Sequence, residues 1–272
     1  MNRGPQMLAE HVDVFKTKVG AAFPGSHTIF LGQDLLRDLK DMDWLALCTM
    51  GIMGRPVPPE HLKWFSQAWV RTSYPDARLW NNRVAALAGT TRSTPNLAIS
   101  AAQAVSEAAI FGRGNEFRAL DFFLKTRQIL DRGTSLADHL EGFLGDGGRM
   151  PGYGRPIASK DERIPLGLEM AKELGVGDGP HVALAFEIDR YFASTNRPLQ
   201  LNMGGLGAAF AADFGWTPQE FNLFMFITFL GGMYPCYVEA TSKPPAAVFP
   251  MRCSDVRYDG VARRNWAPTT GQ

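Results

Sequence analysis

Apolar side chains recur every three or four residues along most of this chain, and short groups of glycine and proline separate one such stretch from the next. This spacing puts the apolar side chains on one face of a helix, so each stretch is predicted to be an α-helix that buries that face. The predicted helices include residues 59–70, 79–88, 98–110, 117–130, 135–144, 165–174 and 180–192. Because no convincing series of strands accompanies them, the fold class is predicted to be all-α, with loops that gather glycine and arginine.

Several residues mark where these helices begin and end. Asp43 is predicted to cap a helix that starts at Trp44, and Asn115 to cap the helix that follows it. Thr217 and Glu220 have the spacing of a capping box, with a proline at the first helical position between them. Near the N-terminus, residues 26–32 are interpreted as one short strand or extended piece, and the pattern becomes helical again from residue 33 to residue 39.

The run at residues 222–238 holds no charged side chain and is near the lower length limit of a membrane-spanning helix. Gly231, Gly232 and Pro235 interrupt it, and no basic segment flanks it to set an orientation. The run is therefore predicted to be a helix that the fold buries on all sides.

The composition of the chain argues against several classes of function. The 272 residues carry a net charge of +1, which favours neither a nucleic-acid partner nor an anionic membrane surface. The 3 cysteines have no CxxC spacing and the 5 histidines are scattered, so neither a disulfide framework nor a metal centre is predicted. The first ten residues lack an apolar run, so no signal peptide is expected and the predicted location is cytoplasmic.

The loop at residues 150–163 combines a fixed bend with charge. Pro151 and Pro156 keep it out of a helix, and Gly152 permits either a positive φ or a close approach of the backbone. Arg155 and Arg163 then flank an acidic pair. Two guanidinium groups on such a loop are typical of carboxylate or phosphate binding, although a helix connection with solvated charges has the same pattern.

A second glycine and arginine loop, at residues 111–116, leads directly into a predicted helix. The exposed N–H groups of that helix start can hold an anion. The loop is not a dinucleotide fingerprint, because no strand precedes it and the third glycine is missing.

Taken together, these loops resemble the citrate synthase family, including its short citryl-CoA lyase branch, over residues 26–260. The segment at residues 26–59, with TIFLGQDLLRDL and MGIMGRPVPP, resembles the family's opening loop and its LTGRLPT helix end. Residues 82–92 and 98–110 lead to IFGRGNE, which is similar to the family's GPLHGGANE motif. Residues 150–163 are similar to its PGFGHxVY…DPR motif, and residues 201–214 to its NVDxxSG…LG motif. Residues 251–260 are similar to its terminal RPRARYVG motif.

The resemblance implies a large helical domain of residues 1–111 with 219–272, and a smaller helical domain of residues 112–218 that closes on it and excludes water. It also implies a homodimer, or a heterodimer with a homologue, because the family's dimers place elements of both subunits at one site. The implied substrate is a carboxylate or an acyl-CoA, with a CoA thioester as substrate and no bound cofactor.

The residues at the family's catalytic positions differ from those the chemistry uses. Phe111 and Arg155 stand where the family has its two histidines, and Gly204 stands where it has its aspartate base. Since a phenylalanine cannot donate to an enolate and a glycine cannot take a proton, a non-standard active site is expected. The predicted catalytic set is Arg155, Glu116, Phe111 and Gly204.

The predicted substrate-binding residues are also carried by the resemblance. Arg163 and Arg252 match arginines that the family uses on carboxylates or CoA phosphates, and Thr228 takes the place of another. The full predicted set is Arg155, Arg163, Arg252, Asn115, Asn202, Thr228 and Tyr153. The candidates for carrying a proton are Glu116, Asp161, Glu162, Tyr153 and Cys236, the last of which is more typical of a buried structural thiol.

Three interpretations follow. The first is a citrate synthase-like enzyme that makes or breaks a C–C or thioester bond, with Arg155 as the electrophile in place of a histidine. The second is a catalytically inactive partner subunit of an active homologue. The third is ordinary citryl-CoA lyase or citrate synthase activity, carried by residues that the motif matching misplaces. The first is the prediction adopted here.

Overall fold

Helices make up most of the part of the chain that the computed structural model describes, which is residues 4–13, 15–108, 112–145, 149–155, 160–245, 247 and 252–264. In chain order the elements are α1 (Gly4–His11), β1 (Gly20–Phe23), β2 (His27–Phe30), β3 (Gln33–Asp34), α2 (Trp44–Met53), α3 (Pro59–Thr72), α4 (Trp80–Thr90), α5 (Pro95–Val105), α6 (Arg113–Asp131), α7 (Leu136–Gly145), α8 (Arg163–Glu173), α9 (Pro180–Ser194), α10 (Met203–Asp213), α11 (Pro218–Phe224), the 3₁₀-helix η1 (Met225–Ile227), α12 (Leu230–Ser242) and the 3₁₀-helix η2 (Cys253–Asp255).

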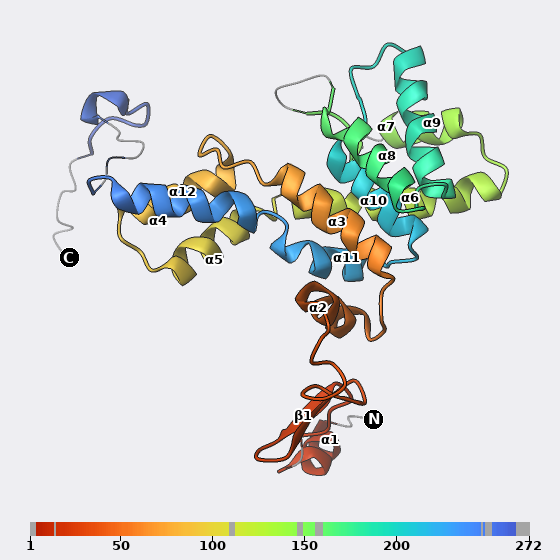
Figure 1. Cartoon of the computed structure of the whole chain (residues 1–272). Helices are drawn as coiled ribbons and strands as arrows, with labels where there is room; N and C mark the ends of the chain where they lie inside the picture. The colour runs from red at the N-terminus through yellow and green to blue at the C-terminus, as the bar shows by residue number, and fades with distance from the viewer. Residues whose placement is uncertain are drawn as a thin grey trace, which may run out of the picture.

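The helices are arranged in two groups joined by a central pair. Figure 1 shows α4, α5 and α12 on one side, α6 to α10 on the other, and α3 and α11 between them. The larger hydrophobic core includes side chains of α3, α6, α8, α9, α10 and α11, with Phe65 of α3 packed against Trp216 and Phe224. A smaller core joins α4, α5 and α12. The larger core crosses the expected boundary at residue 219, and the division into two domains stays a prediction.

The capping signals act locally, and two of the three are confirmed. Asp43 accepts hydrogen bonds from the backbone N–H groups of Leu45 and Ala46, at 2.9 and 3.1 Å. Thr217 and Glu220 form the reciprocal capping box at the start of α11. Each device satisfies N–H groups that a helix start leaves without a partner.

The predicted cap at Asn115 is wrong, because α6 begins earlier. Gly112 is the N-cap, with φ of 70°, and the Arg113 N–H donates to the Ser106 carbonyl oxygen at 3.0 Å. A Cβ at Gly112 would lie 2.0 Å from that same carbonyl oxygen. Only glycine fits this positive φ and close approach, so tertiary contact with the end of α5 sets the helix start.

The N-terminal region contains a small antiparallel sheet in the order β1-β2-β3. The strand predicted at residues 26–32 is confirmed by β2, which pairs with β1 from Gly20 opposite Phe30 to Phe23 opposite His27. The helix predicted at residues 33–39 is wrong. Residue Asp34 joins β3, and its side chain accepts the Leu36 N–H at 2.9 Å, which favours a turn over a helix. In Figure 1 this sheet and α1 project away from the helices, beyond α2.

The apolar run at residues 222–238 is divided among several helices, and the fold buries only part of it. Among the described residues, one stretch, Pro218–Ser242, is long and apolar enough to cross a membrane, and 39% of its most apolar window is buried inside the fold. It is split into α11, η1 and α12. The prediction of a helix buried on all sides is wrong, since Phe226, Tyr234 and Val238 are each about half exposed, at 54, 49 and 61%.

Candidate functional site

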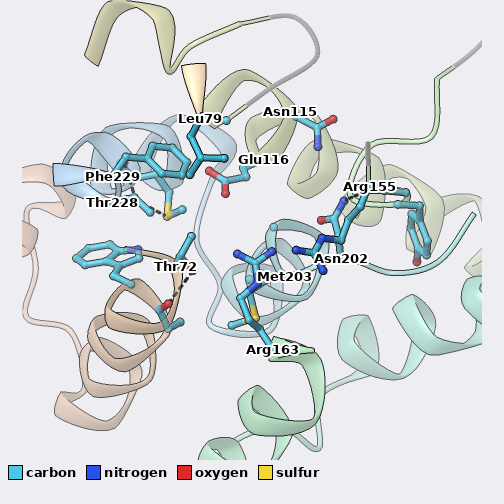
Figure 2. A pocket seen from close by; sticks show the side chains of 18 of the residues that line it. Thr72, Leu79, Asn115, Glu116, Arg155, Arg163, Asn202, Met203, Thr228 and Phe229 are labelled. Carbon is cyan, nitrogen blue, oxygen red and sulfur yellow. Dashed lines mark hydrogen bonds between the residues drawn. The ribbon is translucent and has the colours of Figure 1, made fainter. Parts of the chain in front are cut away.

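A cavity of about 690 Å³ opens where the two helix groups meet. Its walls come from α3, the starts of α6, α8 and α10, the loop at residues 149–155, and residues 225–232. Eight of the predicted site residues line it, namely Asn115, Glu116, Tyr153, Arg155, Arg163, Asn202, Gly204 and Thr228. Figure 2 shows Arg155 and Asn202 on one side, Thr228 and Phe229 on the other, and Glu116 between them.

Two predicted site residues remain, Phe111 and Arg252. Phe111 lies outside the described residues. Arg252 is exposed and does not line the cavity of this single chain, because residues 252–264 lie beyond the end of α12. Its backbone N–H donates to the Asp255 carboxylate at 3.0 Å, within its own short turn.

The loop that carries Arg155 is tied closely to the start of α10. Gly152 and Gly154 have φ of 81° and 83°, and a Cβ at Gly152 would lie 2.7 Å from the Gly205 Cα. Residues on either side of Tyr153 pair with the strand-like segment around Leu201. The glycines therefore permit the positive φ that the sequence predicts, and the close approach is to α10.

Arg163 is held by a fully buried carboxylate. Its Nε and Nη2 atoms donate to Asp161 Oδ1 and Oδ2 at 2.8 and 2.6 Å, and the Met203 N–H donates to the same carboxylate at 2.8 Å. Burial by itself raises the pKa of Asp161, but the hydrogen bonds and charge of Arg163 outweigh it and the pKa is lowered. Asp161 therefore stays ionised and does not carry a proton, and it fixes the guanidinium at the cavity wall.

Arg155 has a more exposed partner. It donates to Glu162 Oε2 at 2.5 Å and to the Lys160 carbonyl oxygen at 2.9 Å, while the Tyr74 hydroxyl donates to Glu162 Oε1 at 2.9 Å. The hydrogen bond from Arg155 is the main reason that the pKa of Glu162 falls to about 2. Glu162 is thus excluded as a proton carrier near neutral pH, and an anion in the cavity would share Arg155 with it.

The Glu116 side chain lies directly beside Gly204, and both residues line the cavity. A Cβ placed on Gly204 would lie 3.2 Å from Glu116 Cγ and 3.3 Å from its Oε1. Glu116 Oε2 is buried and has no hydrogen-bond partner among the described residues. Burial raises the pKa of Glu116 to about 7, against the opposing charges of Arg163 and Arg113. This carboxyl group can therefore change its protonation state near neutral pH.

Three of the predicted binding residues are already engaged by the protein. The Tyr153 hydroxyl donates to the Ala185 carbonyl oxygen at 2.7 Å, and burial holds its pKa well above the ordinary value. The Asn202 amide accepts from the Gly205 N–H and donates to the Gly154 carbonyl oxygen, both at 2.9 Å. The Thr228 hydroxyl donates to the Met225 carbonyl oxygen at 2.7 Å. These groups shape the cavity. Asn115 also lines it, and no hydrogen bond of its side chain is seen in the described chain.

Cys236 lies apart from the cavity lining and is 5% exposed. Burial is the main cause that raises the pKa of its thiol, which keeps it protonated and unreactive. The burial that the interpretation as a structural thiol requires is confirmed.

Sequence reasoning missed the aromatic side of the cavity. Trp64 and Trp69 of α3, together with Phe229, contribute to it. Trp64 donates its indole N–H to the Gly167 carbonyl oxygen at 3.0 Å, whereas the buried indole nitrogen of Trp69 has no partner within the described residues. Their helical spacing is the same as that of ordinary core positions, so no sequence signal separates the two roles.

Comparison of the sequence with protein-family models and with curated proteins gives no match. Solved structures do match. Citryl-CoA lyase from Hydrogenobacter thermophilus gives a TM-score of 0.77 at 19% identity, covering 93% of this chain and 98% of that one. ATP citrate lyase from Methanosaeta concilii, in complex with (3S)-citryl-CoA, gives 0.67 at 13% identity, over 94% of this chain and 44% of that one. Citrate synthase from Thermoplasma acidophilum, in a ternary complex with carboxymethyl coenzyme A and oxaloacetate, gives a TM-score of 0.63 at 15% identity, covering 84% of this chain and 60% of that one.

These matches define the fold as citrate synthase-like, which confirms the all-α prediction. Of the three, citryl-CoA lyase is the one whose length this chain spans almost completely, whereas the chain spans less than half of ATP citrate lyase.

Proposed function

We propose that this cavity binds a carboxylic acid or an acyl-CoA, and that the protein makes or breaks a C–C or thioester bond in it. The observation that carries the proposal is the position of Arg163, fixed by Asp161 at the wall of a cavity that also holds a carboxyl group able to titrate. Fixed guanidinium forks match carboxylate and phosphate oxygens, and a preorganised positive charge stabilises negative charge that develops during reaction.

The solved structures support the same class of ligand. The ATP citrate lyase holds (3S)-citryl-CoA, and the citrate synthase holds a CoA derivative with oxaloacetate. In this chain Arg155 and Arg163 lie at the polar side of the cavity, and Asn115 offers an amide from the first turn of α6. We infer that these three side chains bind the anionic part of the ligand. The aromatic side, with Trp69 and Phe229, would hold its less polar part.

A second copy of the chain is the partner that the surface favours. Tyr234 and Val238 lie one turn apart on α12 and are 49 and 61% exposed, and Phe226, in the preceding 3₁₀-helix η1, is 54% exposed. Apolar groups gathered in this way are typical of a protein interface. The family resemblance implies a homodimer, or a heterodimer with a homologue, in which elements of both subunits contribute to one site. A cytoplasmic location is consistent with the free thiols of Cys48 and Cys236.

Ligand binding tests this proposal before turnover does. Thermal unfolding would be followed with CoA, acetyl-CoA, oxaloacetate, citrate and larger carboxylic acids, in wild type and in Arg163→Ala. A ligand at about 100 times its dissociation constant adds about 2.7 kcal/mol to the free energy of unfolding. We expect stabilisation by an acyl-CoA or a carboxylic acid, and a much smaller effect in the variant. No shift with any of them would contradict the proposal and favour a non-catalytic partner subunit.

A further inference from the structure

We propose that Glu116 carries the proton in this cavity, and that its carboxyl group occupies the space that a side chain at position 204 would otherwise fill. The inference rests on the proposed function, since it assigns a group to the reaction of an acyl-CoA or carboxylic acid. The inference names the residue that transfers the proton, and it explains why position 204 is a glycine.

The Glu116 side chain occupies the space into which a side chain at position 204 would extend. They lie in the first turns of α6 and α10, two helices that pack against each other. A Cβ at position 204 would be 3.2 Å from Glu116 Cγ and 3.3 Å from Oε1, tighter than ordinary contact. A carboxyl group one bond beyond that Cβ, turned toward Glu116, would overlap the Glu116 side chain. Gly204 therefore leaves room for Glu116, and both residues line the cavity.

Two arginines act on the charge of Glu116, yet no salt bridge to it is seen among the described residues. Arg163, which acts on it from the start of α8, has its Nε and Nη2 atoms on Asp161. Arg113, in its own helix, donates to the carbonyl oxygens of Gln103 and Phe226 at 2.7 and 3.3 Å. The carboxyl group is thus close to positive charge, yet its Oε2 atom has no donor among the described residues. Such a group can accept a proton and give it back.

The other titratable candidates are engaged elsewhere. Asp161 and Glu162 are held in ion pairs, with lowered pKa values. The Tyr153 hydroxyl donates to a backbone carbonyl, and Cys236 is buried away from the cavity lining. Among the candidates that the sequence named, Glu116 is the one that lines the cavity and titrates near neutral pH.

The step assigned to Glu116 is removal of a proton from the carbon next to a carbonyl group. The C–H bond breaks, and its electron pair forms the C=C bond of an enolate while the carbonyl π pair moves to oxygen. The proton is transferred to the Glu116 carboxylate. In the reverse direction, protonated Glu116 returns it to carbon. A charge on the enolate oxygen would be stabilised by a guanidinium group at the cavity wall.

Proton exchange with solvent tests this step without a complete turnover. Acetyl-CoA in D₂O would be followed by NMR for exchange of its methyl protons, in wild type, Glu116→Gln, the control Glu169→Gln on the exposed face of α8, and the double variant Glu116→Ala with Gly204→Asp. We expect Glu116→Gln to bind acetyl-CoA as wild type does and to exchange about 10² to 10⁴ times more slowly, with Glu169→Gln unchanged. The double variant should regain a measurable part of the rate, because its carboxyl group returns to the same space.

The outcomes separate this inference from the proposed function. If wild type binds none of the acyl-CoA or carboxylic acid probes, both are overturned. If wild type binds acetyl-CoA and Glu116→Gln exchanges its protons at the wild-type rate, only the role of Glu116 is overturned. A titration of ¹³C-labelled glutamate by NMR adds a test that needs no ligand. It should reveal one carboxyl group that titrates near neutral pH in wild type and is missing in Glu116→Gln, and its absence from wild type would overturn the inference.

Discussion

Arg163 and Asp161 form a two-point ion pair, with Nε to Oδ1 at 2.8 Å and Nη2 to Oδ2 at 2.6 Å, at the start of α8. The same carboxylate accepts the Met203 N–H at 2.8 Å, so a single buried side chain joins the first turns of α8 and α10. The stability of the fold and the placement of a cationic group at the cavity therefore depend on one residue.

Replacing Asp161 should destabilise the protein strongly. Asp161→Asn removes the charge that compensates Arg163, whose side chain is 14% exposed. Loss of one partner of a buried pair costs about 3–5 kcal/mol, and chemical denaturation would measure it. The matched control is Asp76→Asn, which breaks an exposed pair with Arg78 and should leave the midpoint almost unchanged. Equal effects of the two variants would contradict the structural role of Asp161.

The ion pair of Asp161 with Arg163 also predicts a loss of stability in acid. The pKa of the Asp161 carboxyl group is lowered in the folded chain, from an ordinary value of 3.8. The folded chain therefore binds the proton less tightly than the unfolded chain, so the stabilisation is present above pH 3.8 and is lost as the pH falls through the lower folded value. The free energy of unfolding of wild type should fall over this range more than that of Asp161→Asn. Parallel curves for the two proteins would show that Asp161 is not the cause.

The raised pKa of Glu116 predicts that the free energy of unfolding falls as the pH rises, opposite in sign to the effect of Asp161. The pKa of Glu116 rises from 4.5 to about 7 on folding, so its contribution to stability is present below pH 4.5 and is lost as the pH rises through 7. Glu116→Gln cannot ionise, and we expect it to be more stable than wild type by up to about 3 kcal/mol at about pH 8, with little difference in acid. Denaturation curves at several pH values measure this. A difference that does not depend on pH would contradict the raised pKa.

Two glycine substitutions should act with opposite signs. Gly112→Ala forces a side chain into a positive φ, with its Cβ 2.0 Å from the Ser106 carbonyl oxygen, and should cost more than about 1 kcal/mol. Gly142→Ala lies inside α7 with nothing within 4 Å of the new Cβ, and should stabilise the chain by up to about 1 kcal/mol. Thermal unfolding of the two variants tests both. Destabilisation by Gly142→Ala, or none by Gly112→Ala, would contradict this account of the start of α6.

Tyr153→Phe separates a structural role from a ligand-binding role. The variant leaves the Ala185 carbonyl oxygen without its buried donor and should lower the free energy of unfolding by about 1–3 kcal/mol. Ligand affinity should stay within about twofold of wild type, since the hydroxyl group is not available to a ligand. Isothermal calorimetry and denaturation give the two numbers. A large loss of affinity with unchanged stability would restore Tyr153 as a binding residue.

The exposed face of α12 should govern assembly. Val238→Asp places a charge on a surface position that is 61% exposed in the single chain, so folding should be little affected. If α12 forms an interface, the charge would be buried against a second copy and the complex should dissociate. Sedimentation or light scattering measures the mass, with the exposed α8 variant Glu169→Gln as control. An unchanged mass would contradict an interface on this face.

Local signals explain which parts of the fold the sequence could predict. Asp43 and the pair Thr217 and Glu220 act on N–H groups two or three residues away, so these helix starts follow from the residues themselves. The start of α6 does not, because the Ser106 carbonyl oxygen from another helix fixes Gly112 there. The turn after β3 also differs from the predicted helix, since pairing with β2 and the local hydrogen bond to Asp34 together override a short helical pattern.

The sequence by itself therefore determined the helical class, most of the helices, and a set of loops rich in glycine and arginine whose order is similar to that of the citrate synthase family. Only the tertiary structure decided which of the named residues are open to a ligand. It turned Tyr153, Asn202 and Thr228 toward backbone groups, and it brought Glu116 into the space beside Gly204. The physical reason is that helix formation depends on neighbours within one or two turns, whereas burial, ion pairing and the pKa of a carboxyl group depend on atoms from distant segments.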